Sequence, residues 1–141
     1  MKRSLIDSSP ALCEFPAVKK WLFMAGMNGA LAVLAGAFAA HALTPRLEPR
    51  LASAFATGAH YHLVHALAMA VAALAARGAA RGRATLAALL FQAGILLFCG
   101  SLYLLALTGI TAFGYITPLG GLCLVAGWIV LALAALKLET P

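Results

Sequence analysis

The sequence predicts an all-α polytopic membrane protein with four transmembrane helices and a short interfacial helix before the second. Hydrophobic residues make up 64% of the 141-residue chain and charged residues only 10%, whereas a soluble domain has ~25% charged residues. The mean hydropathy is +0.98. The apolar residues form four runs, each long enough to cross a bilayer, which takes about 20 residues.

The first apolar run covers residues 21–43 and follows a polar lead, residues 1–20. Lys19 and Lys20 directly precede Trp21, and a basic flank beside an interfacial aromatic residue is typical of a membrane edge. Asn28 is the one strongly polar side chain between Trp21 and Ala40. This run therefore predicts the first span.

Residues 44–57 are more polar, and they predict the interfacial helix that runs into the second span, residues 57–76. Pro49 suits the first turn of a helix. Leu51, Phe55 and Ala59 fall on one helix face.

The third and fourth spans are expected at residues 84–107 and 117–136, with an uncharged connection between them. Glycines recur in both runs, and small residues of this kind allow helix backbones to approach closely. The chain is thus interpreted as a polar lead followed by a single four-helix domain, residues 21–138.

The basic residues predict the orientation. With four spans, both chain ends and the second loop lie on one side, and that side has most of the cations: Lys2, Arg3, Lys19, Lys20, Arg77, Arg81, Arg83 and Lys137. The other side has only Arg46 and Arg50. The positive-inside rule therefore predicts cytoplasmic N- and C-termini. The net charge of +6 reflects these flanks and lipid contacts, so the expected partner is the lipid bilayer and not nucleic acid; a homo-oligomer or a larger membrane complex stays open.

Two polar side chains are expected at matching depth in different spans. Counted along straight helices from the basic side, Asn28 lies at about 12 Å and Gln92 at about 14 Å. We expect an interhelical hydrogen bond between them that stabilises the bundle by up to about 1–2 kcal/mol.

Three of the four histidines lie close together in the second span: His60, His62 and His65. His62 and His65 share a helix face because they are three residues apart. Three interpretations stay open: hydrogen bonds between helices, a pocket for a small molecule, or a haem or copper site in which His41 joins His62 and His65. We otherwise expect no cofactor.

The spans contain no Asp, Glu, Lys or Arg. An ion-coupled pump usually needs an intramembrane charge, and a serine or cysteine nucleophile needs an oriented base. The sequence therefore favours a protein that is not an enzyme, and we predict no catalytic residue. Cys99 and Cys123 are expected to be buried free thiols.

Four segments resemble the YgdD-like family of small membrane proteins, a domain-of-unknown-function family with a small human transmembrane relative. They are residues 36–43 (GAFAAHAL), 55–68 (FATGAHYHLVHALA), 94–103 (GILLFCGSLY) and 117–121 (TPLGG) followed by Gly127-Trp128. The resemblance covers residues 22–136. It implies a four-helix protein of a bacterial inner membrane with no assigned reaction.

The resemblance and the depth count select the same side chains as a candidate polar pocket in the outer leaflet: His41, Tyr61, His65, Ser101, Tyr103 and Thr117. The family pattern does not include His60 or His62, which disfavours a His62–His65 metal pair as a shared function. We expect a non-enzymatic accessory or small-ligand-binding membrane protein. The alternatives are a haem- or copper-binding redox component that uses His41 and His65, and a small transporter or channel.

Overall fold

The computed structural model describes residues 16–138, and its elements are all helical. The order along the chain is α1 (Pro16–Phe38), η2 (Ala39–Leu43), α2 (Pro49–Ala75), η3 (Gly78–Ala80), α3 (Arg81–Gly94), η4 (Ile95–Cys99), α4 (Gly100–Thr108), η5 (Thr111–Tyr115) and α5 (Thr117–Ala135). The elements η2 and η4 are π-helical turns within longer helices. Such turns locally widen the hydrogen-bonding pattern and occur often at functional sites.

Four stretches of the described chain are long and apolar enough to cross a membrane: Pro16–Leu43, Pro49–Ala75, Gly78–Thr108 and Thr111–Ala135. The predicted all-α, four-span architecture is confirmed. The helix expected before the second span begins at Pro49 and continues into that span without a break. Residues 1–15 of the predicted polar lead lie outside the described residues, and α1 already begins at Pro16.

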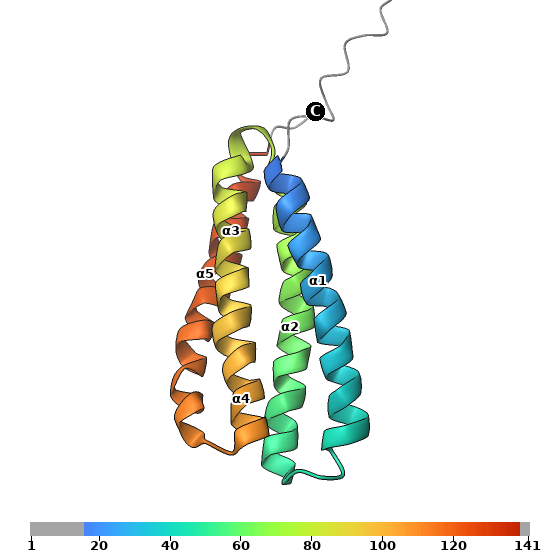
Figure 1. The fold of residues 1–141 in the computed structure, drawn as a ribbon. Coiled ribbons are helices and arrows are strands. Elements are labelled where there is room, and N and C mark those ends of the chain that lie inside the picture. Colours follow the sequence, from blue (N-terminus) through green and yellow to red (C-terminus); the bar gives the residue numbers. More distant parts are fainter. Residues whose placement is uncertain (1–15, 139–141) are drawn as a thin grey trace, which may run out of the picture.

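The helices pack as successive antiparallel neighbours (Figure 1). Helix α1 packs along α2, α2 packs along α3 and α4, and α5 packs along α3 and η4. Helix α5 has few contacts with α2. It is therefore attached to the bundle mainly from one side, and its α2-facing side is left partly open.

Glycines allow the close approach of α5 to its neighbours. A Cβ atom at Gly120 would overlap the backbone nitrogen of Phe98 in η4. A Cβ atom at Gly127 would lie 2.7 Å from ring atoms of Phe91 in α3, which is too close for a carbon–carbon contact. These positions hold the α5 backbone directly against α3 and η4.

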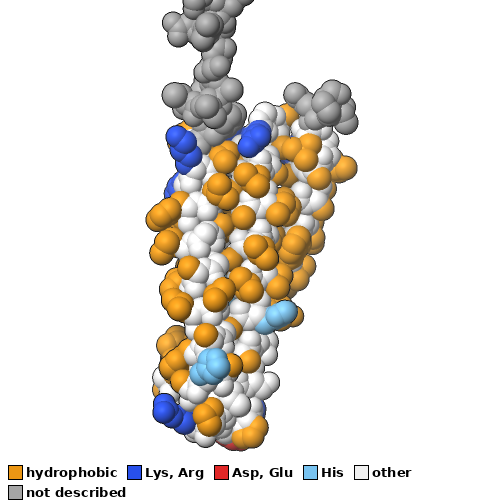
Figure 2. Space-filling view, turned by 90° about the vertical axis from the view of Figure 1, so that its right-hand side faces the viewer, with side chains coloured by type: hydrophobic (Ala, Val, Ile, Leu, Met, Phe, Trp, Pro, Cys, Tyr) orange, Lys and Arg blue, Asp and Glu red, His pale blue; other side chains and the backbone are white. Residues whose placement is uncertain are grey.

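The bundle has an apolar core, an apolar outer surface and a cationic end. The main core cluster is rich in alanine, and Met69 and Phe91 are fully buried in it. Outward-facing side chains along the spans are apolar, for example Phe23 (70% exposed) and Leu122 (67% exposed), as a lipid-facing surface requires. In Figure 2 apolar side chains cover the length of the visible face, and Lys and Arg gather mainly toward the upper end of the view. We call this the basic end.

Candidate functional site: two histidines and a cleft

His62, on α2, is the centre of a hydrogen-bond network that joins three membrane-spanning stretches, since α3 and α4 belong to the single stretch Gly78–Thr108. Its Nε2 atom lies 3.0 Å from Asn28 Oδ1 of α1, and its Nδ1 atom lies 3.2 Å from the Tyr103 hydroxyl of α4. Asn28 Nδ2 donates to Gln92 Oε1 of α3 at 2.9 Å and to the Met24 carbonyl at 2.8 Å. We call His62, Asn28, Gln92 and Tyr103 the polar network.

The chemistry of the groups fixes the direction of these hydrogen bonds. An amide oxygen only accepts, so His62 Nε2 carries the hydrogen and donates to Asn28. His62 Nδ1 then accepts from the Tyr103 hydroxyl. Both amide hydrogens of Asn28 are used, one by Gln92 and one by Met24. His62 and Asn28 are 7% and 8% exposed, so the centre of the network is closed from the lipid, whereas Gln92 and Tyr103 are partly exposed.

His65 lies one helical turn away and faces α5. Trp128 Nε1 of α5 donates to His65 Nε2 at 3.2 Å. Because an indole nitrogen can only donate, His65 Nε2 accepts, and His65 Nδ1 donates to the Tyr61 carbonyl at 2.7 Å. The Tyr61 ring stacks on the imidazole with 5.8 Å between ring centroids.

A cleft of about 480 Å³ lies beside this pair, between α2 and α5. Tyr61, Val64 and His65 form its α2 wall, and Phe98 of η4 lies between the helices. The α5 wall is lined by Pro118, Gly121, Leu122, Leu124, Val125 and Trp128. The cleft is mostly apolar, and the lining residues that have polar groups in their side chains are His65, Trp128 and Tyr61. This composition is typical of a small-molecule site.

A third polar contact joins α4 to the start of α5. Ser101 donates its hydroxyl hydrogen to the Phe98 carbonyl at 2.9 Å. The Thr117 hydroxyl lies 2.8 Å from Ser101 Oγ and therefore donates to it. Ser101 is buried, and its donor is used by a backbone group inside a helix, so this contact ties two helices together.

Comparison with known sequences identifies relatives along most of the chain. The model of the family described as "Protein of unknown function (DUF423)" matches residues 35–121. The UPF0382 membrane protein YwdK of Bacillus subtilis is 41% identical over 85% of this chain and 98% of its own length. The UPF0382 membrane protein of Haemophilus influenzae is 40% identical over 84% of this chain and 94% of its own.

The chain belongs to the DUF423 family. The UPF0382 inner membrane protein YgdD of Escherichia coli is also a relative, with 31% identity over 84% of this chain and 90% of its own length. The resemblance seen in the sequence is therefore confirmed, as is the assignment to a membrane. No solved structure matches the chain significantly.

The structure distributes the six residues of the predicted polar pocket over separate places. Tyr61 and His65 line the cleft. Ser101 and Thr117 bond to each other. Tyr103 faces His62 and not His65. His41 lies in η2 with an exposed side chain. The single pocket that the sequence suggested is therefore replaced by a cleft that contains two of the six.

The structure does bring together the two amides that were expected to meet, since Asn28 and Gln92 share a hydrogen bond. The sequence reasoning missed His62 as the third member. The expected depth of Asn28 was counted from Lys20, whereas α1 is already helical at Pro16, four residues or about 6 Å earlier. Counted from the observed helix ends, Asn28, His62 and Gln92 lie at about 18, 20 and 17 Å. The matching depth of these three side chains would have predicted the network if the start of α1 had been placed correctly.

Trp128 was also missed as a site residue. Tryptophan usually lies at the membrane edge, whereas Trp128 lies eight residues before Leu136, about 12 Å inside the membrane. An indole N–H inside the hydrocarbon region finds no water to bond and needs an acceptor from the protein, and His65 is that acceptor.

The three histidines considered for a metal do not converge. Among residues 16–138, no three His, Cys, Asp or Glu side chains form a group that could hold a metal ion. The acceptor nitrogen of His65 already receives the Trp128 hydrogen, and that of His62 receives the Tyr103 hydrogen. A metal ligand needs this lone pair, so either histidine would have to break its hydrogen bond first. Cys99 and Cys123 are free thiols, and Cys99 is buried as expected, whereas Cys123 is only partly buried.

Proposed function

We propose that the protein is a non-enzymatic membrane protein that binds a small apolar molecule in the cleft between α2 and α5. The observation that carries the proposal is the position of the His65–Trp128 hydrogen bond at the side of an otherwise apolar cavity of about 480 Å³. Apolar walls with a few convergent polar groups are the usual composition of a ligand site.

The chemistry of the cleft suggests the class of ligand. The imidazole supplies an acceptor and the indole supplies a donor, so a ligand hydroxyl can pair with both groups, whereas a ligand carbonyl can accept from the indole alone. The rings of Tyr61, Phe98 and Trp128 surround this point and favour a flat apolar body. A ring-bearing apolar molecule with one or two oxygen atoms fits both requirements.

Several features support a role without catalysis. Glu48 is the one acidic side chain among residues 16–138, and it lies in the turn between α1 and α2, outside the transmembrane stretches. No carboxylate in the described spans can therefore orient His62 or His65 as a general base. The hydroxyl hydrogen of Ser101 is donated to a backbone carbonyl.

The proposal includes an orientation. The basic end has Lys19, Lys20, Arg77, Arg81, Arg83 and Lys137, whereas the opposite end has Arg46 and Arg50. The positive-inside rule places the basic end, and with it both termini, in the cytoplasm of a bacterial cell. The cleft then opens sideways into the outer leaflet.

The test is to analyse the small molecules that copurify with the protein. Substitution Gly121→Leu should fill the cleft without damage to the fold, because a Cβ atom there would make only an ordinary 3.7 Å contact with Phe98. Gly26→Leu adds the same side chain to open space on α1 and is the matched control. Each variant is purified in mild detergent, extracted with organic solvent and analysed by mass spectrometry.

We expect one apolar compound to copurify with the wild type and with Gly26→Leu, and its amount to fall at least tenfold in Gly121→Leu. If only bulk phospholipid copurifies with the wild type, or if Gly121→Leu keeps the compound, the proposal is wrong.

A further inference from the structure

A second cavity, at the basic end, has two cations at its rim. It has a volume of about 250 Å³ and is lined by Arg77, Gly78, Ala79, Lys137 and Leu138. Arg77 follows the end of α2, and Lys137 follows the end of α5. Both side chains are exposed. Among residues 16–138 the one acid, Glu48, lies at the opposite end of the bundle, so the charged side chains described at this rim are both cations.

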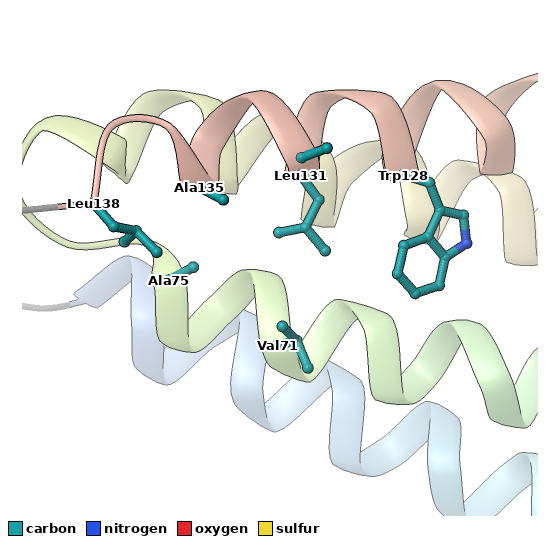
Figure 3. A pocket seen from close by; sticks show the side chains of 7 residues that line it. Val71, Ala75, Trp128, Leu131, Ala135 and Leu138 are labelled. Atoms are coloured by element: carbon teal, nitrogen blue, oxygen red, sulfur yellow. The ribbon is translucent and has the colours of Figure 1, made fainter.

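An apolar groove of about 320 Å³ continues from this rim between α2 and α5. Leu138 lines both cavities. Figure 3 shows Val71 and Ala75 on α2 opposite Trp128, Leu131 and Ala135 on α5. The groove exists because the side chains at positions 75, 132 and 135 are alanines and because α5 is held mainly by α3 and η4. Trp128 closes the groove at its inner end and separates it from the ligand cleft.

The length of the groove matches one leaflet. From Leu138 to Trp128 there are ten residues, or about 15 Å along a helix. The hydrocarbon core of a bilayer is about 30 Å thick, so the groove reaches from the membrane surface to the midplane. An acyl chain of one leaflet covers the same depth.

We infer that this rim and groove bind one anionic phospholipid of the leaflet at the basic end. Its phosphate lies between Arg77 and Lys137, and one acyl chain follows the groove to Trp128. Charge complementarity selects the headgroup, and the alanine-lined groove accepts the chain. The site is separate from the ligand cleft of the proposed function, since the two cavities share only Trp128.

The experiment uses Trp128 as a reporter. Trp21→Phe leaves Trp128 as the one tryptophan of the chain, which contains two. The full-length protein is reconstituted into phosphatidylcholine vesicles with a minor fraction of either phosphatidylglycerol or phosphatidylcholine brominated at mid-chain. Bromine quenches indole fluorescence on contact. We expect brominated phosphatidylglycerol to quench Trp128 more than brominated phosphatidylcholine at the same mole fraction.

Four variants test the two halves of the site. Arg77→Gln or Lys137→Gln should each lower the preference for phosphatidylglycerol about fivefold, which corresponds to about 1 kcal/mol per basic residue. Arg81→Gln removes the same charge from the same end without touching the cavity and should change it little. Ala132→Leu should reduce quenching by phosphatidylglycerol because it fills the groove. Circular dichroism checks that each variant keeps its helical content.

Several results would overturn the inference. Equal quenching by the two lipids would mean that the headgroup is not recognised. An effect of Arg81→Gln as large as that of Arg77→Gln would mean diffuse attraction to the basic end. Loss of the preference on addition of inorganic phosphate would indicate a soluble-anion site, and unchanged quenching in Ala132→Leu would place the chain outside the groove.

Discussion

The polar network around His62 and the cleft beside His65 are built on the same helix, three residues apart, and they differ in what surrounds them. His62 receives partners from α1 and α4 and is linked through Asn28 to α3. His65 has one side-chain partner, Trp128 of α5, at the side of an open cavity. Both histidines are buried, His62 being 7% exposed and His65 5% exposed, but the Asn28 partner of His62 is 8% exposed, whereas the Trp128 partner of His65 is 47% exposed.

This difference suggests which of the two histidines stabilises the fold and which one can bind a ligand. A buried group whose hydrogen bonds are all satisfied stabilises one arrangement of helices, so the network holds α1, α2 and the α3–α4 helix together. A histidine beside an open apolar cavity can exchange its partner for a ligand. Neighbouring histidines on one helix face therefore have different expected roles, and the packing of α5 decides which is which.

The largest expected effect comes from separating α5 from its neighbours. Gly120→Ala places a Cβ atom into the backbone of Phe98, which cannot move aside as a flexible side chain would. We expect a loss of about 1–3 kcal/mol or more in the free energy of unfolding, together with the loss of the cleft. Gly121→Ala, one residue along, makes only ordinary contacts and is the control. Denaturation in mixed micelles measures both, and equal stability of the two variants would contradict the described packing.

Removal of the centre of the polar network should be nearly as damaging. His62→Leu leaves Asn28 Oδ1 and the Tyr103 hydroxyl without their partner inside the protein, and an unpaired buried polar group costs about 1–3 kcal/mol. The matched control is His60→Leu, since His60 is exposed two residues away. Thermal unfolding monitored by circular dichroism should show a lower midpoint for His62→Leu alone. Equal midpoints for the two variants would show that the network does not stabilise the bundle.

A smaller effect is expected at the end of the network. Gln92→Leu removes one acceptor from Asn28, whose amide still donates to the Met24 carbonyl. Hydrogen bonds between transmembrane helices average about 0.6 kcal/mol, and we expect a loss of that size in the same unfolding measurement. A loss as large as that of His62→Leu would mean that Gln92, and not His62, is the centre of the network.

The smallest effect is expected at His41. Its side chain is exposed in η2, and exposed substitutions usually change stability by less than about 0.5 kcal/mol. His41→Ala should therefore keep both the unfolding midpoint and the copurifying compound of the wild type. Loss of a bound metal or haem in His41→Ala, detected by metal analysis and a visible absorption spectrum, would instead revive the redox interpretation.

The fold could be predicted from the sequence because apolar runs and basic flanks depend on local composition. The meeting of Asn28 and Gln92 also followed from depth alone. The position of His62 in their network did not, because the first span was expected to begin at Trp21, five residues after the observed start of α1 at Pro16. The cleft could not be predicted at all. It depends on how Gly120 and Gly127 draw α5 toward α3 and away from α2, and a sequence does not show which neighbour a glycine faces.

The most direct test of the division between network and cleft compares His62→Leu with His65→Leu in one preparation. For each variant, the unfolding midpoint and the amount of copurifying apolar compound are measured against the wild type. The structure predicts that His62→Leu lowers the midpoint, whereas His65→Leu keeps a near-wild-type midpoint and loses the compound. If His65→Leu instead unfolds as readily as His62→Leu, or keeps the compound, His65 is a structural residue and the cleft is not the binding site.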